Sequence, residues 1–183
     1  MNDCLILVDL QNDYFAGGKM PLAGTDQAAA NAQLLLHQFR AEAAPIIHVQ
    51  HLSVQPGASF FLPGTHGAEI HAMVAPRAGE VVVAKNYPNS FRGTALLETL
   101  SSQGLKELVI CGAMSHMCID ATTRAAFDHG FRCTVAEDAC ATRELVFNGK
   151  SIAAPQVHGA FMAALSAVYA KVAATAEIIA SRA

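Results

Sequence analysis

The chain alternates short, continuously apolar runs with longer segments in which apolar residues recur every three or four positions. The apolar runs have the length of β-strands, and their lack of polar alternation indicates burial on both faces. The longer segments have the periodicity of amphipathic helices. We predict strands over 5–8, 45–49, 80–84, 108–111 and 131–135, helices over 28–39, 95–102, 116–129 and 155–168, and either a strand or a helix over 172–179.

This alternation predicts an α/β fold, a three-layer α-β-α sandwich with helices on both faces of a mostly parallel, Rossmann-like sheet. The length of 183 residues suits a single domain over 1–183. In such folds a ligand binds beyond the carboxyl ends of the strands, so we expect the chemistry in the residues that follow each strand. The long connection over 53–70 is typical of a lid or an interface arm.

Composition narrows the class of protein. Hydrophobic residues make up 52% of the chain and charged residues only 15%, which favours a homo-oligomer, a dimer or tetramer, that buries part of the apolar surface. The net charge is −3 without a basic run, so nucleic acid is not an expected partner. No apolar run reaches membrane-spanning length, and the N-terminus lacks a signal-peptide pattern. We expect a cytoplasmic protein that acts on a small molecule away from membranes.

The cysteines point to one candidate nucleophile. An odd number, scattered without metal-type spacing, argues against a disulfide framework. Most of them fall in apolar runs, where cysteine is usually a small buried hydrophobe. Only Cys118 stands at the start of a predicted helix, just after a turn at Gly112. Free N–H groups at a helix start stabilise an anion, so they bias such a thiol toward thiolate and can hold an oxyanion. The five cysteines are Cys4, Cys111, Cys118, Cys133 and Cys140.

Two charged residues follow other predicted strands. Asp9 comes directly after the first strand and Lys85 directly after the third. A carboxylate at the tip of a buried strand is costly unless it is paired or used. It can accept a thiol proton, while an ammonium can hold the thiolate and orient the carboxylate. Either residue alone is as well explained by a cap or a turn, but three complementary groups at three strand tips favour catalysis.

Three segments together resemble a known family. They are the D-L-Q-N-D sequence at 9–13, the N-Y-P-N-S-F sequence after Lys85 and the G-A-M-S-H-M-C sequence at 112–118. Their order and spacing resemble those of the isochorismatase-like cysteine hydrolases, which include nicotinamidases, and the resemblance covers nearly the whole chain. It implies the α/β fold described above and a hydrolase activity.

The resemblance also implies a mechanism. Asp9, Lys85 and Cys118 would form a catalytic triad in which Asp9 accepts the thiol proton, Lys85 stabilises the thiolate and Cys118 attacks an amide carbonyl. Water would then hydrolyse the thioester. In the family, a cis peptide, here between Ala113 and Met114, turns a backbone N–H toward the oxyanion. The oxyanion donors on this chain would be the N–H groups of Met114 and Cys118.

The chain departs from the nicotinamidases at their metal site. Those enzymes carry a D-x-H pair after the second strand, where this chain reads H-V-Q-H-L-S over 48–53 without an aspartate. We therefore expect no metal and no other cofactor, with His51 lining the pocket and His48 packed within the strand. A histidine-rich metal site that draws on His66 and His71 is the alternative.

Candidate substrate-binding residues flank these segments. The aromatic candidates fit core or interface positions equally well, and His116 fits a solvent-facing position equally well. The candidate apolar walls are Phe15, Phe60, Phe61 and Tyr87, and the other candidates are His51, His116 and Met117.

Three functions remain open on the sequence. The first is a cysteine-dependent hydrolase that cleaves a C–N bond of a small amide, cyclic amide or ureide. The second is a vinyl-ether hydrolase of the isochorismatase type, in which Asp9 acts as general acid and no cysteine is needed. The third is a thiol sensor or binding module on the same fold, without turnover.

Overall fold

The computed structural model describes residues 3–182, so residues 1, 2 and 183 of the predicted domain lie outside the described part. A six-stranded sheet has the order β3-β2-β1-β4-β5-β8, and each pair of neighbouring strands is parallel. This confirms the predicted α/β class. The strands are β1 Asp3–Val8, β2 Ile46–His51, β3 Val81–Lys85, β4 Glu107–Ala113, β5 Arg132–Ala141 and β8 Lys171–Ala173.

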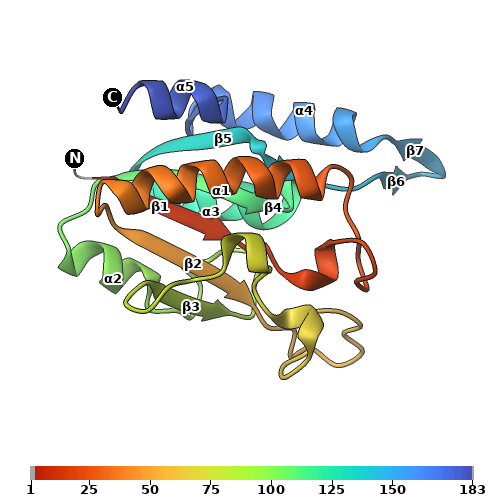
Figure 1. Cartoon of the computed structure of the whole chain (residues 1–183). Helices are drawn as coiled ribbons and strands as arrows, with labels where there is room; N and C mark the ends of the chain where they lie inside the picture. Colours follow the sequence, from red (N-terminus) through yellow and green to blue (C-terminus); the bar gives the residue numbers. More distant parts are fainter. Residues whose placement is uncertain (1–2, 183) are drawn as a thin grey trace.

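Helices cover both faces of the sheet, with α1 across one face and α3 behind it (Figure 1). Leu5 and Leu7 of β1 pack in one apolar cluster with residues of α1 and α5. Ile6 and Val8 point to the other face, in a cluster with residues of α2, α3 and α4. The alternation of strand side chains thus builds two cores and three layers. The helices are α1 Thr25–Ala41, α2 Leu96–Ser102, α3 Asp120–Asp128, α4 Ala154–Ser166 and α5 Thr175–Ala180.

The C-terminal third differs in detail from the prediction. Strand β5 continues to Ala141 instead of ending at residue 135, and its register with β4 shifts between Ile110 and Gly112. The apolar run ends at residue 135, and the acidic residues Glu137 and Asp138 follow it. In the structure the carboxylate of Asp138 accepts hydrogen bonds from the backbone N–H and the hydroxyl of Thr175, both at 2.7 Å. These two donors compensate the charge of Asp138 within the strand.

Of two further segments, one was left open between two alternatives and the other was not predicted. The open segment over 172–179 contains both alternatives, since β8 ends at Ala173 and α5 begins at Thr175. A small antiparallel hairpin, β6 Leu145–Phe147 and β7 Lys150–Ile152, was not predicted. Its turn is Asn148-Gly149, and both residues have positive φ angles, 49° and 72°. Asn-Gly is a strong hairpin signal, and the hairpin projects from the end of the molecule (Figure 1).

Short 3₁₀ turns span Asn12–Tyr14, His66–Ala68 and Ala72–Val74. The last two lie in the connection between β2 and β3, which crosses the carboxyl edge of the sheet. No helix within residues 3–182 is long and apolar enough to cross a membrane.

Glu80 anchors the start of β3 to its neighbours. Its carboxylate accepts from Arg40 Nε at 2.7 Å and from the Arg77 backbone N–H at 2.8 Å, and lies 2.9 Å from His48 Nε2. The hydrogen bond from Arg40, with those from Arg77 and His48, lowers the pKa of Glu80 to about 2 although partial burial opposes this. The charged form of Glu80 is therefore the one that the fold stabilises.

The Glu80→Gln variant is expected to lower the free energy of unfolding at pH 7 by about 1–3 kcal/mol. Because folding lowers the pKa of Glu80 from 4.5 to about 2, its contribution is present above the unfolded pKa and is lost as the pH falls through that range. Urea unfolding at pH 7 and at pH 2 measures this, and the difference between variant and wild type should shrink at the lower pH. The exposed Glu98 provides the control Glu98→Gln, which should match wild type. An equal loss at both pH values would contradict the assignment.

Candidate active site

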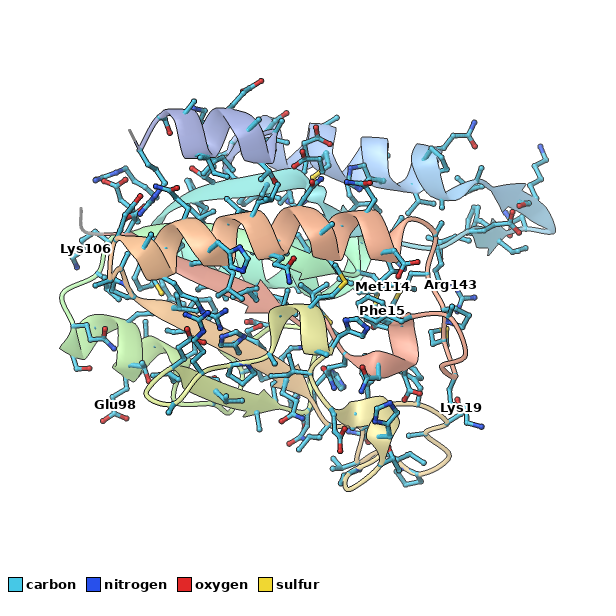
Figure 2. The ribbon with its side chains drawn as sticks, in the orientation of Figure 1. Phe15, Lys19, Glu98, Lys106, Met114 and Arg143 are labelled. Carbon is cyan, nitrogen blue, oxygen red and sulfur yellow. The ribbon has the colours of Figure 1, made fainter. Side chains whose placement is uncertain are left out.

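The carboxyl edge of the sheet brings Asp9, Lys85 and Cys118 together. Lys85 Nζ donates to Asp9 Oδ2 at 2.7 Å and to Cys118 Sγ at 3.2 Å. Asp9 follows β1, Lys85 ends β3, and Cys118 lies in the turn after β4. Their exposed fractions are 0%, 1% and 5%, so these three polar groups form a closed, nearly dry cluster. Figure 2 shows Met114 and Phe15 toward this edge of the molecule, with Lys106 and Glu98 labelled at the opposite end.

His51 completes the surroundings of the Lys85 ammonium. Its Nδ1 lies 2.9 Å from Lys85 Nζ, so Asp9, Cys118 and His51 supply acceptors for all three ammonium hydrogens. Burial lowers the pKa of His51, and the charge of Lys85 lowers it further. Burial opposes the charge of Lys85, but Asp9 and Cys118 outweigh it and raise the pKa of the lysine. The cluster therefore holds an ammonium and a neutral imidazole that accepts from it.

Burial disfavours the thiolate form of Cys118. Burial, and then the negative charge of Asp9, raises the pKa of the Cys118 thiol, and the charge of Lys85 opposes this only in part. A base is therefore needed to activate the sulfur.

Asp9 has a free acceptor for that proton. Its Oδ1 is buried and has no hydrogen-bond partner among the described residues. Asp9 also has a φ of 54°, an unusual backbone conformation for a residue other than glycine. A buried, unpaired carboxylate oxygen is costly, and the sulfur of Cys118 lies close to this carboxylate. The orphaned oxygen fits the role of proton acceptor.

The same cluster has the composition of a metal site, but a cation already fills it. One ligand atom each from Asp9, His51 and Cys118 lie within 4.8 Å of one another. Lys85 Nζ lies within 3.2 Å of one atom in each of these three residues. A metal ion would have to displace this ammonium, so the donor set does not fit a metal. His66 lies away from it and pairs with Glu69 at 2.9 Å on the surface.

The backbone before Cys118 is shaped by a close approach of two strands. Gly112 has a φ of 127°, and a Cβ atom there would lie 2.0 Å from the Val8 carbonyl oxygen. The Ala113–Met114 peptide bond that follows is cis, as the resemblance implies. A π-helical turn over Ser115–Ile119 then leads into α3, where a continuous helix over 116–129 was predicted.

The Gly112→Ala variant is expected to lower the free energy of unfolding by about 3 kcal/mol or more, because the methyl group must push two backbone segments apart. Gly79 provides a matched control, since its φ is 91° but nothing lies within 4 Å of the place that a methyl group would take. Gly79→Ala should cost only about 1–2 kcal/mol for the left-handed backbone. Chemical denaturation of both variants tests this, and equal losses would contradict the close-approach argument.

Aromatic residues lie beside the cluster, where the His51 ring is 6.0 Å from that of Phe61 between centroids. The Phe61 ring lies 4.5 Å from that of Tyr14 and 4.9 Å from that of Phe60, measured between centroids. Phe15 stacks on His71 at 3.7 Å and packs in the same apolar cluster as Met114. Three of the four predicted apolar walls thus lie together. Tyr14, which was not predicted, belongs to the same cluster, because the turn after β1 places it there.

The remaining substrate candidates have different surroundings. Tyr87 lies under the guanidinium carbon of Arg92, 3.7 Å from the ring centroid. The Nδ1 atom of His116 lies 2.6 Å from the hydroxyl of Thr142. Met117 is 41% exposed, so it borders the turn toward solvent.

Two residues of the first motif, Gln11 and Asp13, position this site, and the role of Asp13 was not predicted. Gln11 is fully buried, and its side-chain amide accepts from the His51 N–H at 2.7 Å and donates to the His51 carbonyl at 2.8 Å. Asp13 accepts from the Phe61 N–H at 2.6 Å. Gln11 thus holds the strand that carries His51, and Asp13 holds Phe61. The sequence signal for Gln11 and Asp13 was a dense run of polar residues directly after a buried strand.

Fold and site together define an α/β protein with a buried cysteine beside a lysine–carboxylate pair. Residues 3–177 match the family model described as isochorismatase domain. The chain therefore belongs to the isochorismatase family, and it is a hydrolase of that family.

Several relatives agree with this assignment. The isochorismatase family protein YddQ of Bacillus subtilis is 52% identical over 175 residues, which cover 96% of this chain and 97% of the relative. A crystal structure of an isochorismatase hydrolase from Oleispira antarctica is similar, with a TM-score of 0.95, 53% identity and coverage of 98% and 96%. A streptothricin hydrolase from Streptomyces noursei is 34% identical over 88% of this chain and 61% of its own length.

Proposed function

We propose that the protein hydrolyses a C–N bond of a small amide, cyclic amide or ureide through a thioester on Cys118. The observation that carries the proposal is the buried contact of Lys85 Nζ with both Asp9 Oδ2 and Cys118 Sγ, at 2.7 and 3.2 Å. A sulfur, a base and a fixed positive charge within one closed cluster are the parts that acyl transfer needs. The similarity to a streptothricin hydrolase supports hydrolysis of a small molecule.

In the first half of the reaction Asp9 Oδ1 accepts the proton of the Cys118 thiol, and the Lys85 ammonium stabilises the thiolate. The sulfur attacks the carbonyl carbon, and the C=O π electrons move onto oxygen. The N–H groups of Met114 and Cys118 hold this oxyanion. Collapse of the intermediate breaks the C–N bond, and the leaving nitrogen takes the proton from Asp9, which leaves a thioester.

In the second half Asp9 accepts a proton from water, and the water oxygen attacks the thioester carbon. The same two N–H groups hold the second oxyanion. Collapse breaks the C–S bond, releases a carboxylic acid and returns the proton from Asp9 to the Cys118 sulfur. The role of Lys85 is electrostatic throughout, because its raised pKa keeps it protonated.

The closed surroundings favour a small substrate. Phe15 and Phe60 would contact its apolar part, with His51, Tyr87, His116 and Met117 around them as further contacts. We also infer a homo-oligomer, because Val146 and Phe147 at the tip of the hairpin are 67% and 69% exposed.

A substrate panel tests the proposal. The protein is incubated with small primary amides, cyclic amides and ureides, and separately with isochorismate, and the release of ammonia or amine and of pyruvate is measured. Release of ammonia or amine is the expected result. Pyruvate release without any C–N cleavage would replace the proposal with the vinyl-ether hydrolase. Fast alkylation of Cys118 without either product would replace it with the thiol sensor.

A further inference from the structure

A second group of polar side chains lies next to the nucleophile turn and takes no part in the mechanism above. The Ser115 hydroxyl lies 2.9 Å from His158 Nδ1, and His158 Nε2 lies 3.6 Å from Glu137 Oε2. Ser115 is fully buried at the start of the π-helical turn that carries Cys118. His158 belongs to α4 and Glu137 to β5. The three residues therefore link the nucleophile turn to two other elements.

The Ser115 hydroxyl has two hydrogen-bond partners. Ser115 Oγ also lies 3.3 Å from the Ala141 carbonyl oxygen, which can only accept. The Ser115 hydroxyl can donate to the Ala141 carbonyl or to His158 Nδ1, so either atom of the Ser115–His158 hydrogen bond can be the donor. On its other side His158 Nε2 faces the Glu137 carboxylate. In either direction His158 is the side chain that fixes the Ser115 hydroxyl.

Ser115 is well placed to hold the oxyanion donors. It directly follows Met114, whose carbonyl accepts from the N–H groups of Met117 and Ile119 at 3.0 and 3.2 Å. The turn thus folds back on Met114, and a shift of Ser115 would move Met114 and Cys118 with it. An oxyanion hole is sensitive to such shifts, because its donors act only at hydrogen-bond distance from the developing charge.

We propose that His158 is a positioning residue that fixes the oxyanion-hole backbone through the Ser115 hydroxyl. The inference rests on the proposed function, since it assumes that Met114 and Cys118 N–H groups hold an oxyanion. His158 does not touch the reacting atoms, and Glu137 orients its ring from the far side. Replacing His158 should therefore impair reactions of Cys118 that form an oxyanion and spare those that do not.

Two probes of the same sulfur separate these cases. 4-Nitrophenyl acetate acylates a thiol through an oxyanion and releases 4-nitrophenol, whereas iodoacetamide alkylates it by direct displacement of iodide without one. The rate at which the His158→Leu variant reacts with the ester should be at least about tenfold lower than that of wild type. The upper bound is the loss of about 10²-fold that follows removal of an oxyanion donor. Its alkylation rate should stay within about twofold of wild type.

The His158→Asn variant is the matched control, because its side-chain amide can take the place of Nδ1 as donor or as acceptor and should restore most of the ester rate. Ser115→Ala should reproduce His158→Leu. An unchanged ester rate in His158→Leu, or equal losses with both probes that asparagine does not rescue, would overturn the positioning role. If wild type is alkylated at Cys118 but never acylated, the proposed function fails, and this inference fails with it.

Discussion

Replacing Cys118 with alanine is expected to abolish turnover, with a loss on the order of 10⁶-fold in kcat, as for removal of the nucleophile from another hydrolase triad. The sulfur is the atom that would carry the acyl group, and no other cysteine contacts Lys85 in the described residues. Cys118 is almost fully buried, and its loss removes only one sulfur atom, so the fold should remain intact. Steady-state kinetics with a substrate identified from the panel, together with circular dichroism, measure both quantities.

Cys133 provides the control. It is also a buried, free cysteine, but it packs in the core between α3 and β5. Cys133→Ala should retain near wild-type kcat, with only a loss of stability. If Cys118→Ala kept substantial activity while Asp9→Asn lost it, the thioester mechanism would be wrong and Asp9 would act as the general acid of a vinyl-ether hydrolase.

Replacing Lys85 with methionine is expected to lower the free energy of unfolding by about 3–5 kcal/mol, the usual cost of removing one partner of a buried ion pair. The shape of the side chain is nearly kept, but the Asp9 carboxylate is left in a site where it is 0% exposed. Turnover should also be lost, because no cation remains to hold the thiolate. Urea unfolding at pH 7 measures the change in stability.

A double variant separates charge from packing. In Asp9→Asn with Lys85→Met no charge is left unpaired, so most of the stability should return while turnover stays absent. Lys106 is exposed at the opposite end of the molecule (Figure 2), and Lys106→Met should change neither quantity. Full stability of Lys85→Met alone would show that Asp9 and Lys85 are not a charged pair in the fold.

Much of the fold was predictable because its strands are buried on both faces. Runs such as Leu5 to Val8 and Leu108 to Cys111 have no polar alternation, and the structure places both in the centre of the sheet. The extension of β5 was not predictable from the local pattern. Within this extension Asp138 accepts a hydrogen bond from Thr175, which is far away in the chain.

Part of the site was also predictable from the sequence. The convergence of Asp9, Lys85 and Cys118 was predictable, because the carboxyl ends of parallel strands meet at one edge. The rise in the pKa of Cys118 was not, since burial depends on the whole fold. The contact between Ser115 and His158 was equally hidden, because it joins residues on different elements and no motif marks it.

The most direct test of the central claim is the intact mass of the wild-type protein, quenched with acid during turnover of an amide substrate. The account predicts a mass increase equal to the acyl group, which peptide mapping assigns to Cys118 and which disappears when the substrate is exhausted. Turnover at full rate with no adduct at any quench time, and with alkylated Cys118 still active, would contradict it.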